Sequence, residues 1–338
     1  MTSIEALAFA FCFNLRYIDI PNSVTSIGYE AFHVCKSLEK IVIPSSVISI
    51  GQGAFVACWS LKEITVSKTN PRYSSIDGVL FDKQAKSLLA YPPSSNTQAY
   101  SMPEGVQSIG ERAFYGCALL ENILIPYGVV KVGDEAFSDC TSLKSIYLPK
   151  SVTSIGEKAF DGCSALSLAV VAGEIKTIEE WTFGGCSSLE KFTIPDSVTK
   201  IGDDAFRGCS SLESVIIPDN VFSMGAVAFN WCHSLKSVYI SNKITSIEDY
   251  TFNMCSSLES INIPKSVTAI GRGAFMDCAS LKLIVIPDSV TEISDDAFRG
   301  CRSINEIVVE TRQSPAYGYF SWTSHRYYIF VRPAWFRD

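Results

Sequence analysis

Residues 140–162 read CTSLKSIYLPKSVTSIGEKAFDG, and the same pattern starts again at Cys163. The chain of 338 residues holds twelve cysteines, and ten of the eleven gaps between consecutive cysteines are 23 residues long. The exception, from Cys58 to Cys117, spans 59 residues, which is one period plus 36. A fixed period indicates a repeat architecture, whereas zinc sites and disulfide frameworks use short, uneven cysteine spacings.

The other fixed positions of the repeat predict its local structure. A Phe stands three residues before every Cys, and a Leu stands three residues after it in every copy except the last, which has Ile304. The L-x-x-I-x-I run alternates apolar and polar residues, as a strand with one buried face does. A Pro ends this strand in eight copies, because it has no N–H for a strand ladder. The V-T-x-I run predicts a second short strand on another side of the coil.

The remaining part of the repeat, G-x-x-A-F-x-x-C, is expected to form a short helical turn. Its Gly, present in eight copies, is expected to turn the chain through a positive φ. Acidic residues near the start of this segment suit the positive end of a helix dipole. A calcium-binding ladder is disfavoured, because no D-x-D-x-D-G loop accompanies them. These acids are Glu111, Asp134, Glu157, Glu180, Asp203, Asp249 and Asp295.

No single repeat can bury its own apolar face, but stacked repeats can. The sequence therefore predicts a β-rich α/β solenoid, a coil of about 12 repeats with parallel strand ladders and short helical turns. Phe and Cys then form internal columns. In-register neighbours lie about 4.8 Å apart, beyond the Cβ–Cβ separation near 3.8 Å that a disulfide prefers. We therefore expect buried, reduced cysteines that act as small hydrophobic residues.

The repeat C-x-S-L-x-x-I-x-I-P-x-S-V-T-x-I-G-x-x-A-F-x-x resembles the BspA-like class of leucine-rich repeats over residues 1–310. The resemblance implies that the solenoid is a right-handed leucine-rich-repeat coil. Within the long gap, residues 70–81 and 88–92 look like the variant repeat of this family. Physically, residues 67–105 predict two strands, near 79–81 and 87–91, that form a hairpin projecting from the coil. The resemblance implies similarity to proteins displayed on the surfaces of anaerobic protozoa and of mouth and gut bacteria, which are associated with adhesion to host proteins and cells.

Composition and motifs exclude several other functions. A net charge of −7 argues against a nucleic-acid partner, which usually requires a basic face. No run of 18 apolar residues is present, so membrane insertion is not expected. The sequence has no H-E-x-x-H, G-x-S-x-G or P-loop motif. We expect no enzyme activity, no catalytic residues, no cofactor and no metal site.

Function is expected on positions that the repeat leaves free, and the outward positions of the main strand are the best candidates. An exposed apolar and tyrosine stripe there is typical of a protein-binding face. The alternative is that β-branched residues simply favour exposed strands. The candidate protein-binding residues are Tyr17, Leu124, Tyr147, Val170, Thr193, Ile216, Tyr239, Asn262 and Val285.

These observations favour a non-catalytic protein-binding repeat module, in cell-surface adhesion or host-protein recognition by resemblance, with a protein ligand of unknown identity. The alternative is an intracellular protein–protein interaction scaffold. Reduced cysteines favour it, and so does an N-terminus that has no basic region and carries Glu5 early, unlike a secretory signal. Location therefore stays open between the cell surface or extracellular space and the cytoplasm.

Two further features lie outside the stripe. Four residues after each Cys, acidic and basic residues mostly alternate from one copy to the next, which predicts ion pairs across the ladder.

Residues 311–338 leave the repeat and hold nine aromatic residues. They are predicted to cap the open end of the solenoid, or alternatively to dock a partner or a second copy, so the chain is expected to be a monomer or a weak dimer through this tail.

Overall fold

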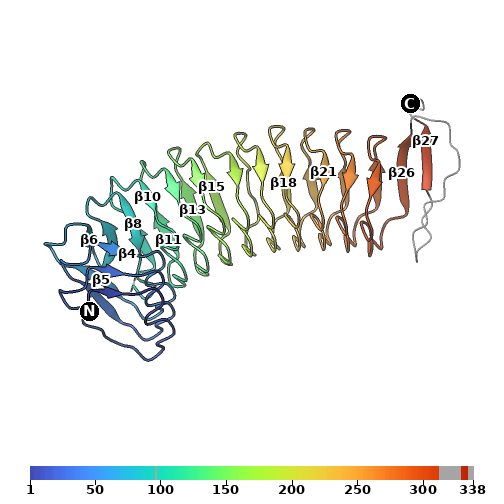
Figure 1. Ribbon diagram of the computed structural model, residues 1–338. Helices are drawn as coiled ribbons and strands as arrows, with labels where there is room; N and C mark the ends of the chain where they lie inside the picture. The colour runs from blue at the N-terminus through green and yellow to red at the C-terminus, as the bar shows by residue number, and fades with distance from the viewer. Residues whose placement is uncertain (96, 312–328, 334–338) are drawn as a thin grey trace. The chain divides into compact units, whose positions relative to one another are not determined.

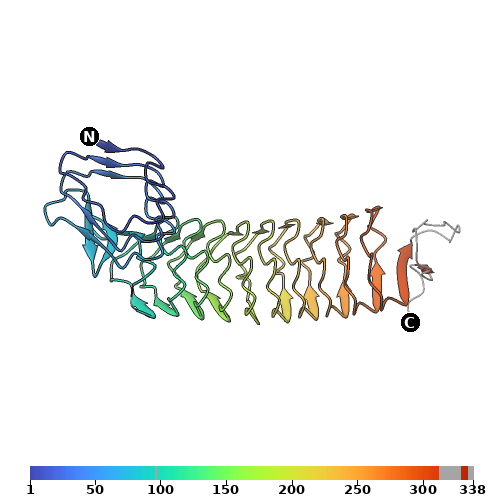
Figure 2. The same ribbon diagram turned by 90° about the horizontal axis from the view of Figure 1, so that it is seen from below.

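The computed structural model describes residues 1–95, 97–311 and 329–333. The predicted fold class is confirmed: the chain is a parallel-strand β-solenoid of about 13 turns (Figure 1). It divides into two compact units. Unit 1 comprises residues 1–175 and 181–186, and unit 2 comprises residues 176–180 and 187–338. In both units, successive coils stack with their strands side by side (Figure 2).

Unit 1 holds four sheets, ordered β1-β2-β4, β3-β5, β14-β12-β10-β8-β7-β6 and β15-β13-β11-β9. Its strands are β1 (Ser3–Ile4), β2 (Ser26–Ile27), β3 (Lys40–Ile43), β4 (Ser49–Ile50), β5 (Glu63–Val66), β6 (Tyr73–Ile76), β7 (Val79–Asp82), β8 (Ser87–Ala90), β9 (Ala99–Ser101), β10 (Ser108–Ile109), β11 (Asn122–Leu124), β12 (Lys131–Val132), β13 (Ser145–Leu148), β14 (Ser154–Ile155) and β15 (Leu168–Val171).

Unit 2 holds three sheets, ordered β16-β17-β19, β21-β23-β25 and β18-β20-β22-β24-β26-β27. Its strands are β16 (Thr177–Ile178), β17 (Lys200–Ile201), β18 (Ser214–Ile216), β19 (Ser223–Met224), β20 (Ser237–Tyr239), β21 (Ser246–Ile247), β22 (Ser260–Asn262), β23 (Ala269–Ile270), β24 (Leu283–Ile286), β25 (Glu292–Ile293), β26 (Glu306–Thr311) and β27 (Ile329–Pro333).

The predicted helical turns are wrong: no helix occurs in the described residues. The segment before each Cys is a series of tight turns, and the residues five and one before the Cys have a positive φ, as in Glu135 (51°) and Asp139 (58°). Alternate N–H groups then donate to the next coil instead of within a helix. Phe137 N–H, for example, donates to the carbonyl of Ala159 at 2.8 Å. Stacking therefore takes the hydrogen bonds that a helix would make internally.

The repeat Gly has a different role from the predicted one. None of the eight glycines that follow the short strand has a positive φ. At Gly156, a Cβ would instead lie 2.5 Å from the backbone N of Asp134 and 2.7 Å from the carbonyl carbon of Gly133. Contact with the preceding coil explains the preference for Gly at this position, because neighbouring backbones approach closely there.

The acidic row also differs from its prediction, because no helix dipole exists for it to stabilise. Three of its aspartates accept backbone hydrogen bonds from the next coil, which helps to fix the register between coils. The donors are the N–H groups of Glu157 to Asp134 (3.1 Å), Ala226 to Asp203 (2.9 Å) and Arg272 to Asp249 (2.6 Å).

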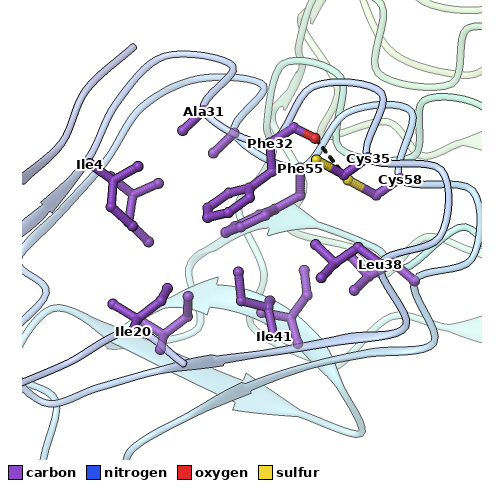
Figure 3. Packing of buried hydrophobic residues seen from close by; sticks show 14 of the residues in the cluster. Ile4, Ile20, Ala31, Phe32, Cys35, Leu38, Ile41, Phe55 and Cys58 are labelled. Atoms are coloured by element: carbon purple, nitrogen blue, oxygen red, sulfur yellow. Dashed lines mark hydrogen bonds between the residues drawn. The ribbon is translucent and has the colours of Figure 1, made fainter. Parts of the chain in front are cut away.

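The core is built on a column of stacked rings and a column of thiols (Figure 3). Phe137 and Phe160 lie 5.2 Å apart, centroid to centroid, with an interplanar angle of 5°. The thiol of Cys58 donates to the carbonyl of Phe32, 26 residues earlier, at a sulfur–oxygen distance of 3.1 Å. The same bond recurs along the column, so each buried thiol helps to satisfy a buried carbonyl of the preceding coil.

All twelve cysteines are free, and only Cys12 is exposed. Burial raises the pKa of the Cys186 and Cys232 thiols, so they stay protonated and unreactive. We expect a thiol reagent such as Ellman's reagent to label about one cysteine rapidly in the native protein and all twelve in denaturant. The variant Cys12→Ser should lose the rapid phase. Fewer than twelve thiols in denaturant would indicate disulfides and contradict the column.

The variant segment differs from the predicted projecting hairpin. Strands β7 and β8 lie close to the predicted positions and are antiparallel, but a third strand, β6, precedes them and also pairs with β7. Val79, Leu80 and Phe81 are buried, and β8 continues the ladder into β10. The hairpin forms part of the solenoid wall because its apolar side chains bury there.

At the C-terminal end, β27 lies parallel to β26, with Val308 paired to Phe330. The rest of the segment predicted to cap the coil or to dimerise, residues 312–328 and 334–338, lies outside the described residues.

Candidate protein-binding face

In unit 1, the predicted stripe forms a continuous row on β11, β13 and β15. Leu124 is 64% exposed, Tyr147 is 55% exposed and Val170 is 37% exposed. Tyr147 pairs directly with Val170, and Asn122 pairs with Ser145, which puts Leu124 in register with Tyr147. The intervening side chains of β13 and β15, Ile146 and Ala169, are buried in the core. We call Leu124, Tyr147 and Val170, together with the neighbouring Leu168, the unit 1 face.

In unit 2, a second row lies on β18, β20, β22 and β24. Ile216 is 68% exposed and pairs with Tyr239, which is 44% exposed. The Tyr239 hydroxyl donates to Asp219 at 3.3 Å and accepts from the Asn242 amide at 3.1 Å. These bonds hold the ring in place while leaving much of its surface open, a combination that suits a protein contact. Asn262 follows in the row and is paired with Val285.

Not every predicted residue joins these rows. Tyr17 is exposed but lies in the first coil, apart from the sheet that carries the unit 1 face. Thr193 is exposed without belonging to a strand, and Val285 is only half exposed. The candidates missed two residues on the same strands, Leu168 and Leu283, which are exposed five residues after their Cys. Their apolar character at an outward position was the signal that could have identified them.

The predicted ion pairs across the ladder are confirmed at four places. Lys62, for example, donates to Glu39 and lowers the pKa of that carboxyl. The lysine of each pair is well exposed, so each pair adds little stability, and the pairs serve mainly to avoid like charges on neighbouring coils. The pairs are Lys62–Glu39 (2.9 Å), Lys144–Glu121 (2.5 Å), Lys236–Glu213 (3.1 Å) and Lys282–Glu259 (3.2 Å).

Neither a metal centre nor a membrane span is found in the described part of the chain. Within residues 1–95, 97–311 and 329–333, no group of three His, Cys, Asp or Glu side chains is placed to hold a metal ion. The same residues contain no helix with the length and apolar character needed to span a bilayer.

The comparisons with known proteins agree with this architecture. The stacked coils define a leucine-rich repeat protein. The family described as BspA type leucine rich repeat region matches in six copies over residues 2–88, 87–212 and 176–305. The chain therefore belongs to the BspA type leucine-rich repeat family. Among curated proteins, no match was found.

Solved structures of leucine-rich repeat proteins are similar over most of the chain, and two of them serve as examples. A leucine rich cell surface protein from Faecalibacterium prausnitzii is 30% identical, with 91% of this chain and 83% of that chain covered and a TM-score of 0.57. A leucine-rich repeat protein from Eubacterium ventriosum is 27% identical, with 82% of this chain and 80% of that chain covered and a TM-score of 0.57.

Proposed function

We propose that this protein is a non-catalytic binding module that recognises a protein ligand on a cell surface through its exposed strand rows. The observation that carries the proposal is the unit 1 face, where consecutive parallel strands each present a large apolar or aromatic side chain to solvent. Contiguous exposed apolar surface of this kind marks interaction sites, and aromatic residues are enriched at the centres of interfaces. The likeness to a cell surface protein of Faecalibacterium prausnitzii supports the location, and an adhesive role would follow from it.

The face can be tested with beads coated with the protein and applied to cultured epithelial cells. The double variant Leu124→Ser/Tyr147→Ser is expected to reduce bead retention at least fivefold, because the centre of the apolar row is removed. The control is Val130→Ser, which truncates a side chain of similar exposure in unit 1 at a position outside the face. Unchanged retention by the double variant, or an equal loss with Val130→Ser, would contradict the proposal.

A further inference from the structure

The ring column of unit 1 is interrupted at the variant segment. Phe55 stacks on Phe32 with centroids 5.8 Å apart, and the column resumes where Tyr91 stacks on Phe114 at 4.9 Å. Between the two parts lies a cavity of about 210 Å³. Its apolar wall includes Phe55, Leu80, Leu89 and Tyr91, and none of these residues belongs to the exposed strand rows.

One wall of this cavity carries backbone donors that lack acceptors. In the first two coils, alternate N–H groups of the turn segment donate to the next coil, as Phe32 does to Ala54 at 2.9 Å. The equivalent donors of the third coil are the N–H groups of Gly53, Phe55 and Ala57. None of these three has an acceptor among the described residues, although Phe55 and Ala57 are buried. Buried N–H groups without a partner are rare in folded proteins.

The opposite wall carries the complementary acceptors. In the coil that ends at Cys140, the carbonyls of Asp134 and Ser138 accept hydrogen bonds from the preceding coil. The equivalent carbonyls one coil earlier are those of Glu111 and Tyr115, and within the described residues nothing donates to either. Between them, the carbonyl of Ala113 accepts from Tyr91 N–H at 2.7 Å. Of these three carbonyls, that of Ala113 alone has a donor within the described residues.

Elsewhere, the variant segment accepts hydrogen bonds from backbone N–H groups of the third coil. Ile50 N–H donates to the Tyr73 hydroxyl at 2.8 Å and Val66 N–H to the Ser75 hydroxyl at 3.0 Å. Ile64 N–H donates to the carbonyl of Gly78 at 2.7 Å. These strand donors of the third coil are therefore paired. Of the three unpaired donors, those of Gly53 and Phe55 belong to residues that line the cavity, and Ala57 lies two residues further on.

We propose that this cavity binds a short main-chain segment of a partner protein. A peptide amide offers a carbonyl on one side and an N–H on the other, which matches a site with donors on one wall and acceptors on the opposite wall. Completing an open ladder in this way is a recurrent mode of peptide recognition. The cavity is smaller than the 300–1,000 Å³ or so of a pocket for a drug-sized ligand, so it holds about two residues of a peptide, and the rest of the peptide stays outside it.

Charge at the cavity narrows the class of peptide further. Arg112 lines the cavity but is already held by Glu30 and Glu135. Glu111 also lines it, and burial raises the pKa of this carboxyl. Three carboxyl groups against one guanidinium leave the region negative even when Glu111 is protonated, so an acidic peptide is disfavoured. The expected ligand is neutral or basic, with Ala or Leu next to the paired amides.

The experiment uses the full chain labelled with ¹⁵N and the probe acetyl-Ala-Leu-Ala-Ala-amide. The amide resonances of Gly53, Phe55 and Ala57 are expected to shift to saturation, and their hydrogen exchange to slow at least tenfold. A probe with N-methylated amides, which cannot donate to Glu111 and Tyr115, is expected to bind at least tenfold more weakly. No shift with either peptide, as when water alone fills the gap, or equal binding of both peptides would overturn the proposal.

Variants separate this site from the strand face. Ala90→Phe places a ring on the cavity wall and is expected to abolish the shifts, while Ala118→Phe, at an exposed position outside the cavity, should bind the probe like the wild type. The double variant Leu124→Ser/Tyr147→Ser should also keep the shifts, so failure of the face and failure of the cavity are distinguishable. If Ala90→Phe does not fold, the comparison of the two probes on the wild type still decides the question.

Discussion

Replacing Phe229 by Ala is expected to lower the free energy of unfolding of unit 2 by about 3–5 kcal/mol. The Phe229 ring is fully buried and is stacked on both sides, at 5.2 Å from Phe206 and 5.7 Å from Phe252. Truncation removes the apolar contact, opens a cavity and deletes two ring pairs. Because each coil contacts only its neighbours, loss of this ring also weakens the coupling between coils on which the cooperativity of a repeat protein rests.

The measurement is urea unfolding of the full chain, combined with native-state hydrogen exchange of the amides in β18, β20 and β22, which report on unit 2 directly. The matched control is Phe222→Ala, since Phe222 is 59% exposed and lies in the same unit. This control should change stability by no more than about 0.5 kcal/mol. Similar losses in the two variants would show that the ring column is not a main source of stability.

The sequence predicted the fold because its strongest signals are periodic. Every apolar position of the 23-residue repeat has one environment, so the strands, the ring column and the thiol column follow from the pattern alone. The ion pairs across the ladder could be predicted for the same reason: neighbouring coils are in register, as Lys236 and Glu213 show.

The conformation of the turn segment could not be predicted from the repeat pattern. Ala, Phe and Cys at spacings of one and three residues fit a helical turn. The residue type at a single position, such as Glu135, does not predict a positive φ. The left-handed conformation is stabilised by the next coil, which accepts the N–H group of Glu135 at 2.8 Å. Hydrogen bonds between residues 22 apart in sequence override the local helix propensity of this segment. Such long-range bonds cannot be predicted from the local sequence.

The candidate face could also be predicted only in part from the sequence. The alternation of the strands predicted which side chains point outward, and Leu124, Tyr147 and Ile216 are exposed as this requires. The exposed fraction also depends on neighbouring coils, which explains why Val285 is only half exposed at the same repeat position. The cavity could not have been predicted from sequence at all, because it arises where the variant segment fails to reproduce the hydrogen bonds of a regular coil.

Replacing Arg112 by Met is expected to lower the stability of unit 1 by about 2–4 kcal/mol at pH 8. The guanidinium lies 2.5 Å from Glu30 in the second coil, and it donates to both oxygens of Glu135 at 3.0 and 2.9 Å. It thereby joins coils on either side of the variant segment. Its side chain is only 19% exposed, so Met would leave the two carboxylates partly buried and without their counter-ion, a costly arrangement.

Two controls make this prediction specific. Adding Glu30→Gln and Glu135→Gln to Arg112→Met should recover much of the loss at pH 8, because the uncompensated charges are gone. Arg112→Lys keeps the charge but cannot bind Glu135 with two parallel bonds, and it should fall between the wild type and Arg112→Met. A loss that the Gln substitutions leave unchanged would assign the role of Arg112 to packing of its alkyl stem instead of to its charge.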